Sequence, residues 1–327
     1  MKTHILFHFR KGAGGGGNQF LSSLRDYFLK EGVYAENPKD ADVILFNSHH
    51  LLEKAFFLKK KHPNKVFVHR IDGPISTYRK KEKFWDKAIF EINDLIADAA
   101  VFQSEWSQEE NKKLFPFSGL ETVIHNGADE AVFNRKAKSV FNRKKVKLVS
   151  TSWSSSFLKG FDILQFLDKS LDFSKYAMTF VGNSPVGFKR IKSLKPVSSR
   201  ELASILKSHD IFIAPSKTES CSNALIEALS CGLPSVAFNS SSYPEVLKEG
   251  GELFFSKEDI LGKIEKVKNN YFFYQSRIPD FSLTNKAKEY YGFFEKAIAI
   301  KRINLSASLK FALIKLMILK GKIINKL

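Results

Sequence analysis

The chain has 327 residues, 43% of them hydrophobic, which is enough for two domains that each bury a substantial core. Its formal net charge of +18 suggests a polyanionic neighbour, either nucleic acid or an anionic membrane face. Two cysteines are too few for a disulfide framework or a thiolate metal cluster, and they suit a reducing cytosol.

Short apolar runs alternate with amphipathic helical patterns in the first part of the chain. We expect strands at residues 4–9, 43–46, 66–69, 99–104 and 120–124. We expect helices at 20–30, 49–61 and 84–97, and a further helix with its cap at Ser107. Apolar residues alternate with His and Arg at residues 4–9, which predicts a strand there rather than a signal peptide. The sequence contains no uncharged apolar run of about 18 residues, so we expect no membrane span.

The polar, basic segment 134–145 interrupts the pattern and is predicted to be a linker. A second alternating series follows, with strands at 147–152, 178–183, 211–213 and 234–238 and helices at 161–169, 199–208 and 223–230. The sequence therefore predicts an α/β protein with two Rossmann-like, doubly wound domains that face each other across a cleft. We place the domains at 1–140 and 141–285, followed by C-terminal helices and a basic tail at 286–327.

The most informative stretch is PSKTESCSNALIEALSCGLP, residues 215–234. Ser222 is a plausible N-cap for a helix that ends near Gly232, and a polar loop precedes it at the end of a buried strand. A helix N-terminus attracts anions, and Glu219 and Glu227, with seven residues between them, could accept hydrogen bonds from hydroxyls. A ligand whose phosphates bind the amides and whose hydroxyls bind the two acids would be a nucleotide-sugar. An isolated pair of glutamates, however, is more often structural.

With its CGLP sequence and the following Pro244-Glu245, this stretch resembles the donor-binding signature of the retaining family 4 glycosyltransferases, which have the GT-B fold. The resemblance implies that Glu219 contacts the hydroxyls of the donor sugar and Glu227 those of the ribose. It also implies that the amides of Ser222 and Asn223 face the diphosphate. It implies no cofactor and no metal, the nucleotide-sugar being a substrate.

Further donor-binding residues are predicted in two other segments. Glycines in the loop before the first helix let the backbone approach the donor, and Asn18 could cap that helix; the residues are Gly15, Gly16, Gly17 and Asn18. The same loop also matches the G-x-G-x-x-G dinucleotide fingerprint, but nothing in the second half supplies hydride chemistry.

The resemblance implies that Lys159 reaches the diphosphate and that Gly182 forms a turn after the second strand of the donor domain. The arginine that the family usually places a few residues before this lysine is absent here. Arg190 is a candidate replacement by location only.

His69 and Asp72 follow a buried strand on the side expected to line the cleft. The histidine could relay a proton or hold a sugar hydroxyl, and the aspartate could orient the acceptor. Family members often place a histidine here, and which of the two is catalytic stays open. Asp40 and Asp42 imitate a metal-binding D-x-D motif but precede a strand, so we predict no metal.

These features predict a retaining hexosyltransferase that uses a nucleoside-diphosphate sugar and a glycan or glycolipid acceptor, in polysaccharide, lipopolysaccharide or glycolipid assembly. The alternatives are a nucleotide-sugar epimerase on the same fold and a basic nucleic-acid-binding protein. Leucines and lysines in the tail alternate as in a cationic amphipathic helix, so residues 303–327 are expected to bind an anionic membrane surface. We therefore expect a cytoplasmic protein attached to the inner face of the membrane, with no specific nucleic-acid partner.

Overall fold

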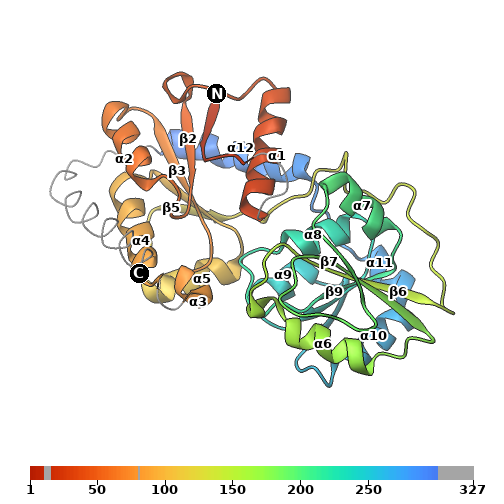
Figure 1. Ribbon diagram of the computed structural model, residues 1–327. Coiled ribbons are helices and arrows are strands. Elements are labelled where there is room, and N and C mark those ends of the chain that lie inside the picture. The colour runs from red at the N-terminus through yellow and green to blue at the C-terminus, as the bar shows by residue number, and fades with distance from the viewer. Residues whose placement is uncertain (11–15, 80–81, 301–327) are drawn as a thin grey trace. The chain divides into compact units, whose positions relative to one another are not determined.

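The computed structural model describes residues 1–10, 16–79 and 82–300 (Figure 1). The chain forms two compact units. Of the described residues, Met1–Phe9, Leu24–His125 and 286–300 belong to the first unit, and 10, 16–23 and Asn126–Asn285 belong to the second. Gly15 and the proposed membrane segment 303–327 lie outside the described residues.

The first unit is built on a five-stranded parallel sheet with its strands in the order β1-β2-β3-β4-β5. The strands are β1 (Thr3–Leu6), β2 (Val43–Asn47), β3 (Val66–Ile71), β4 (Ala99–Phe102) and β5 (Leu120–Val123). A parallel bridge between Thr3 and Tyr34 extends the pairing beyond β1. Tyr34 therefore pairs on the side of β1 opposite to β2, so the direction of chain progression reverses at β1, as expected of a doubly wound sheet.

Helices cover both faces of this sheet (Figure 1). They are α1 (Gly16–Lys30), α2 (Leu52–Lys61), α3 (Ile75–Tyr78), α4 (Phe84–Ile96), α5 (Glu105–Leu114) and α12 (Leu283–Ala299), with the short 3-10 turn η1 (Pro38–Asp40). Apolar side chains of α2 and α4 pack with those of β1, β2 and β3 on one face. On the other face, Phe28 of α1 contacts Phe294 of α12 at 6.3 Å between ring centroids.

The second unit contains a six-stranded parallel sheet in the order β11-β10-β9-β6-β7-β8. The strands are β6 (Val146–Ser152), β7 (Tyr176–Gly182), β8 (Lys192–Leu194), β9 (Ile211–Ala214), β10 (Ser235–Phe238) and β11 (Gly251–Phe254). Chain order reverses between β6 and β9. Ligands of such sheets bind at this reversal, outside the carboxyl ends of the strands.

Two apolar layers enclose the second sheet. The helices are α6 (Phe161–Ser170), α7 (Ser199–Lys207), α8 (Asn223–Ser230), α9 (Tyr243–Leu247), α10 (Ile260–Asn269) and α11 (Tyr271–Ser276), with the 3-10 turn η3 (Phe157–Lys159). Successive residues of β9 point to opposite faces, because Phe212 and Ala214 pack with α7, α8 and α9, whereas Ile211 and Ile213 pack with α6 and α10. The predicted α/β class with two doubly wound parallel sheets is confirmed.

Most predicted elements are present, but several boundaries were wrong. The first strand ends at Leu6, the first helix begins at Gly16, and β3 continues to Ile71, so His69 lies inside this strand. The helix expected at 49–61 begins at Leu52, because Ser48 and Leu51 adopt positive φ angles of 46° and 55° and break the helical path. The helix expected to be capped at Ser107 begins at Glu105, and its N-cap is Ser104, whose side chain accepts a hydrogen bond from the Ser107 N–H.

Candidate functional site

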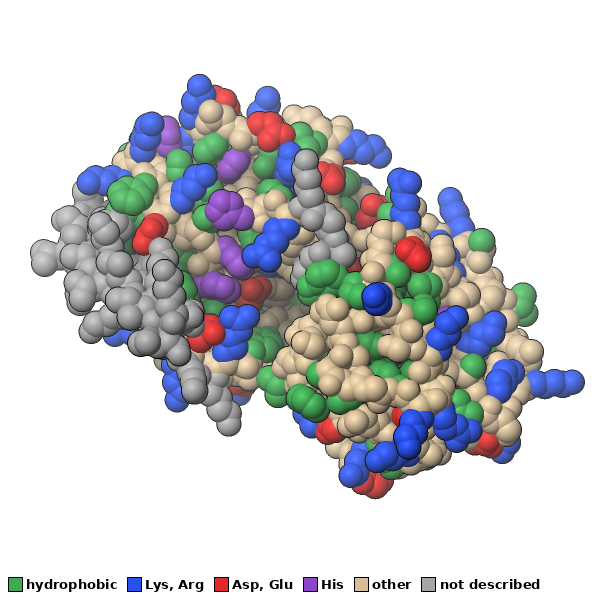
Figure 2. Space-filling view, viewed as in Figure 1, with side chains coloured by type: hydrophobic (Ala, Val, Ile, Leu, Met, Phe, Trp, Pro, Cys, Tyr) green, Lys and Arg blue, Asp and Glu red, His purple; other side chains and the backbone are tan. Residues whose placement is uncertain are grey.

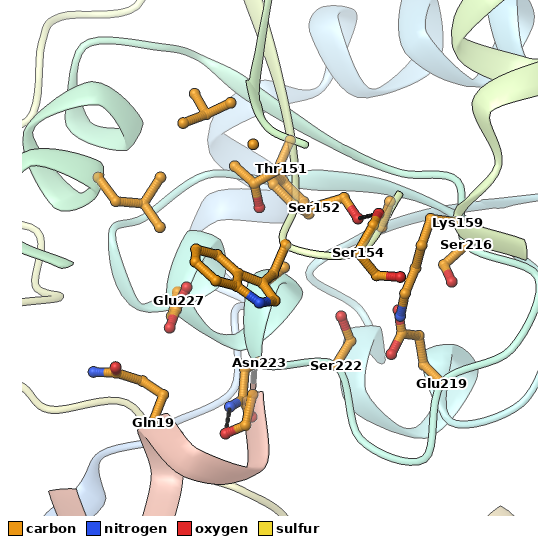
Figure 3. Close-up of a pocket in the computed structure, with 18 of the residues that line it drawn as sticks. Gln19, Thr151, Ser152, Ser154, Lys159, Ser216, Glu219, Ser222, Asn223 and Glu227 are labelled. Atoms are coloured by element: carbon orange, nitrogen blue, oxygen red, sulfur yellow. Dashed lines mark hydrogen bonds and ion pairs between the residues drawn. The ribbon is translucent and has the colours of Figure 1, made fainter. Parts of the chain in front are cut away.

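A cavity of about 500 Å³ lies within the second unit, beyond the carboxyl ends of β6 and β9 (Figure 3). Its walls come from the end of β6, the turn η3, the loop after β9, the first turn of α8 and the first turn of α1. The predicted donor residues that line it are Gly16, Lys159, Gly182, Glu219, Ser222, Asn223 and Glu227. The reversal of the sheet therefore brings together residues that are widely separated in sequence.

Helix α8 presents its N-terminus to this cavity. The Ser222 side chain accepts a hydrogen bond of 3.3 Å from the Leu225 N–H, which confirms Ser222 as the N-cap. The N–H groups of Asn223 and Ala224 have no intrahelical acceptor because they lie in the first turn, and both residues line the cavity. Free amides and the positive end of the helix dipole suit an anionic ligand group.

Glu219 and Lys159 form an ion pair at the cavity wall (Figure 3). The Lys159 Nζ lies 2.7 Å from Glu219 Oε1, and the two side chains are 26% and 19% exposed. The loop that carries Glu219 is fixed by a hydrogen bond from the Glu219 N–H to the Ser241 side chain, at 2.9 Å. Both charges therefore reach the cavity from rigid supports.

Glu227 also lines the cavity, one turn into α8. Burial raises the pKa of its carboxyl group from 4.5 to about 8, so this acid holds a proton at neutral pH. Among the described residues no hydrogen-bond donor or cation pairs with this carboxyl group. It is therefore able to meet a ligand hydroxyl without first giving up a protein partner.

Lys159 is the one Lys or Arg side chain among the described residues that line the cavity. Trp153 and Ser154 occupy the region where the family resemblance leads one to expect an arginine. Arg190 does not fill this role in the structure, because it is not part of the cavity wall and its guanidinium lies 4.2 Å from the centre of the Phe173 ring. Hydroxyls and backbone amides therefore make up much of the polar wall.

Two glycines shape the wall because no larger residue fits. Gly182 has a φ of 136°, and a Cβ atom there would lie 1.9 Å from the Ser152 carbonyl oxygen. Gly160, next to Lys159, has a φ of 78°, and a Cβ atom there would lie 2.0 Å from the Pro215 carbonyl oxygen. The close approach of these backbones sets the position of Lys159 and of the end of β7.

The described part of the N-terminal glycine segment meets the cavity at its first residue. Gly16 lines the cavity, whereas Gly17 is not part of its wall. The Asn18 side chain accepts a hydrogen bond of 2.9 Å from the Arg10 N–H instead of capping the helix that contains it. This bond ties the residues before the glycines to the first turn of α1.

Tyr243 is a cavity residue that sequence reasoning missed. It is 2% exposed, and burial, followed by the charge of Glu219, raises its pKa, so its hydroxyl stays protonated. It immediately precedes the Pro244-Glu245 pair used for the family resemblance, so that pair was the available signal.

The predicted catalytic residues His69 and Asp72 belong to the first unit. The His69 ring is fully buried, stacks on Phe46 at 4.2 Å between centroids, and places Nε2 3.0 Å from the Ser48 carbonyl oxygen. Burial lowers its pKa from 6.5 to about 4. An enclosed ring favours a structural role, whereas Asp72, 32% exposed and 3.4 Å from the buried Arg70 guanidinium, is open to solvent.

The described residues offer neither a metal-binding cluster nor a membrane-spanning helix. No group of three or more His, Cys, Asp or Glu side chains among them is arranged to hold a metal ion. Within the same residues, none of the helices combines the length and apolar character that crossing a membrane requires.

The solved structures that this chain resembles include glycosyltransferases of the GT-B class. HepE of Anabaena, solved with UDP and glucose, superposes with a TM-score of 0.71 over 90% of this chain and 100% of its own, at 14% identity. Sucrose-phosphate synthase of Thermosynechococcus elongatus superposes with a TM-score of 0.65 over 86% of this chain and 78% of its own, at 16% identity. At this level of identity the likeness establishes the fold, and the protein has the GT-B fold.

A sequence family matches part of the second unit. Residues 172–269 match the family described as "Glycosyl transferases group 1", which confirms the resemblance seen in the sequence. An uncharacterized 41.2 kDa protein in the cps region of Klebsiella pneumoniae is 33% identical over 98 residues, which are 28% of this chain and 27% of that protein. The family match and the fold together support a glycosyltransferase that uses a nucleotide-sugar.

Proposed function

We propose that the protein is a retaining glycosyltransferase that moves a hexosyl group from a nucleoside-diphosphate sugar to an acceptor hydroxyl. The observation that carries the proposal is the cavity in which the α8 N-terminus, Lys159, Glu219 and Glu227 meet. Phosphates suit the amides and Lys159, and sugar and ribose hydroxyls suit the two acids. We propose UDP-sugars as the first donors to test, because HepE and the pneumococcal O-GlcNAc transferase GtfA were solved with UDP.

The proposed chemistry needs positioning and charge neutralisation. As the bond between sugar and diphosphate breaks, negative charge grows on the leaving phosphate, and Lys159 and the free amides of Asn223 and Ala224 stabilise it. The departing phosphate takes the proton of the acceptor hydroxyl, which attacks from the same face, so the anomeric configuration is retained. Glu219 holds the sugar hydroxyls during transfer, and Asp72 is the accessible candidate for orienting the acceptor.

A two-stage experiment tests the proposal. A thermal-shift panel of UDP-, GDP- and ADP-sugars identifies the donor, and NMR of the product formed with a glycan acceptor gives its anomeric configuration. We expect an α-linked donor to give an α-linked product, and Glu219→Ala to abolish transfer while the protein keeps its fold. An inverted product, or a sugar changed without any acceptor, contradicts the proposal, and the second result identifies an epimerase.

We propose that transfer needs neither metal nor cofactor. The Asp42 carboxylate, half of the D-x-D sequence, accepts a hydrogen bond of 2.7 Å from the Lys2 N–H, so it already has a structural partner. Replacing Asp40 and Asp42 together by asparagine, and adding EDTA in a separate assay, should leave turnover intact. A collapse of turnover under either condition contradicts this part of the proposal.

We propose that the net positive charge of the protein favours binding to an anionic membrane surface rather than to nucleic acid. Lys and Arg side chains are spread widely over the face shown in Figure 2 instead of forming one concentrated patch. We expect any DNA binding to vanish at moderate salt, as non-specific phosphate contacts do. Specific and non-specific DNA binding can be separated at about 200 mM salt. Sequence-dependent DNA binding that persists at this concentration favours the nucleic-acid alternative.

Residues 303–327 are proposed to attach the enzyme to the inner face of the cytoplasmic membrane, where it assembles a cell-surface polysaccharide, lipopolysaccharide or glycolipid. The sequence pattern is that of a cationic amphipathic helix, with leucines at helical spacing and lysines at the positions between them; the residues are Leu305, Leu309, Leu313, Leu316, Lys315, Lys322 and Lys326. Truncation after Arg302 should move the protein from the membrane to the soluble fraction. A tail of the same composition in scrambled order is the matched control, and equal binding by both tails refutes an amphipathic helix.

A further inference from the structure

Asn126 lies beside the cavity without being part of its wall. Its side chain is buried, with the residue 2% exposed, and its Nδ2 donates a hydrogen bond of 2.7 Å to Asn223 Oδ1. Its backbone N–H points to the Cys221 sulfur at 3.3 Å, which holds it against the loop before α8. Asn126 therefore contacts a residue of the wall from behind.

This contact decides which way the Asn223 amide points. Because Oδ1 accepts from Asn126, the Nδ2 of Asn223 is directed toward α1, where it donates a hydrogen bond of 2.6 Å to the Gly16 carbonyl oxygen. A reversed Asn223 amide would set two NH2 groups against each other at Asn126 and two oxygens against each other at Gly16. The two bonds thus form one directional chain, Asn126 to Asn223 to Gly16.

Gly16 is the residue that allows the close approach. A Cβ atom added there would lie 3.0 Å from Asn223 Nδ2 and 3.4 Å from its Cγ, which is tighter than ordinary contact. A Cβ atom added at Gly17 would meet nothing within 4 Å. A side chain at position 16 would therefore press on the Asn223 amide, whereas one at position 17 would not.

The chain of bonds joins two helix N-termini at one cavity. Gly16 begins α1 and Asn223 begins α8, and both line the wall. The first-turn amides of both helices lack intrahelical acceptors. Since Lys159 is already paired with Glu219, these amides carry a large share of the charge of a bound diphosphate. Their spacing therefore affects donor binding.

We propose that Asn126 is a positioning residue for donor binding, which acts through Asn223 to seat the first turn of α1 against the first turn of α8. The inference rests on the proposed function, because it takes the ligand of the cavity to be a nucleoside-diphosphate sugar. Asn126 touches no donor atom. Its effect is to fix the orientation of the Asn223 amide and, through it, the place of Gly16.

The test compares Gly16→Ala, Asn223→Ala, the double variant, and Asn126→Ala by calorimetric titration of the donor's nucleoside diphosphate. We expect each single variant to weaken binding about fivefold or more, as loss of one hydrogen bond does. Gly16→Ala should have no further effect once Asn223 is Ala, because the amide that it displaces is gone. The matched control is Gly262→Ala in α10, where an added Cβ, unlike one at Gly16, meets nothing within 4 Å.

Asn126→Asp adds a signature that a loss of packing does not produce. A carboxylate offers only acceptors, so Asn223 must turn its NH2 group toward residue 126 and set its Oδ1 against the Gly16 oxygen. We expect Asn126→Asp to weaken donor binding more than Asn126→Ala does. In steady-state assays the KM for the donor should rise by a larger factor than kcat falls, since the variants leave Glu219 and Lys159 in place.

The results of these titrations distinguish failure of the positioning role of Asn126 from failure of the proposed function. If the wild type binds the diphosphate but Gly16→Ala binds as tightly as Gly262→Ala, or if the Gly16 and Asn223 effects add, the positioning inference is overturned alone. If the wild type binds no nucleoside diphosphate and no nucleotide-sugar, the proposed function is overturned and the inference with it. Because Gly16 is exposed, its variant should fold even where the buried Asn126 variants do not.

Discussion

The Lys159 ammonium and the Glu219 carboxylate lie 2.7 Å apart in the wall of the cavity. One is placed by the turn η3 before α6, the other by the loop after β9, so the pair joins the two halves of the second sheet at its reversal. A donor diphosphate competes with Glu219 for Lys159. The pair therefore links binding of the phosphates to placement of the acid that is proposed to hold the sugar.

Glu219→Gln and Lys159→Met should have opposite effects on nucleoside-diphosphate binding. Lys159→Met removes a charged hydrogen-bond donor, so affinity should fall roughly tenfold to a hundredfold. Glu219→Gln releases Lys159 from its carboxylate, so the diphosphate without sugar should bind at least as tightly as to the wild type, while transfer is lost. Isothermal titration and a transfer assay measure the two effects, and weaker diphosphate binding by Glu219→Gln would contradict the competition.

Gly182→Ala should damage both the fold and the cavity. Its φ of 136° is strained for alanine, and the added Cβ would collide with the Ser152 carbonyl at 1.9 Å. Strain of this kind costs about 1–3 kcal/mol, before any shift of β6 and β7 is counted. Gly187→Ala is the control, because an added Cβ there meets nothing within 4 Å. Equal melting temperatures for the two variants would show that the turn at Gly182 tolerates a side chain.

His69 should make the protein less stable in mild acid. Its pKa is about 4 when folded and 6.5 when free, so the unfolded chain binds more protons between these values, and stability falls as pH drops from 6.5 toward 4. One such group changes the unfolding free energy by at most about 1.4 kcal/mol per pH unit. Urea unfolding between pH 6.5 and 5 should show a shallower dependence for His69→Gln. An unchanged slope would mean that the ring titrates normally.

Glu227 should act in the opposite direction at higher pH. Burial raises its pKa to about 8 from 4.5, so the folded protein binds more protons between these values, and stability falls as pH rises from 4.5 to 8. Glu227→Gln keeps the shape without the charge. Its stability relative to the wild type should therefore increase from pH 6 to pH 8, as followed by chemical unfolding. A constant difference between the two proteins would show that Glu227 is ionised at neutral pH.

The part of the site that depends on local sequence was predictable. The cap at Ser222, the helix that follows it and the spacing of Glu219 and Glu227 all lie in one continuous stretch, where start and stop signals are explicit. The pairing of Lys159 with Glu219 was not, because it depends on strand order, which places β6 beside β9. Nor was the hydrogen bond from Asn126 to Asn223, which joins residues 97 positions apart.

The burial of individual side chains could not be predicted from the sequence. The run that ends at His69 was correctly predicted as a buried strand, but the strand continues to Ile71, so His69 lies inside it and its ring packs on Phe46. The delayed start of α2 has a different cause. Ser48 and Leu51 adopt positive φ angles although neither is a glycine, so nothing in the sequence indicates the break before α2.

The measurement that tests the account most directly is titration of the wild type and of Lys159→Met with UDP and with the UDP-sugar chosen by the thermal-shift panel. The account predicts that the wild type binds both, that Lys159→Met loses roughly tenfold or more in affinity for both, and that Gly262→Ala binds as the wild type does. Binding that is unaffected by Lys159→Met, or no binding of any nucleoside diphosphate or nucleotide-sugar by the wild type, would contradict it.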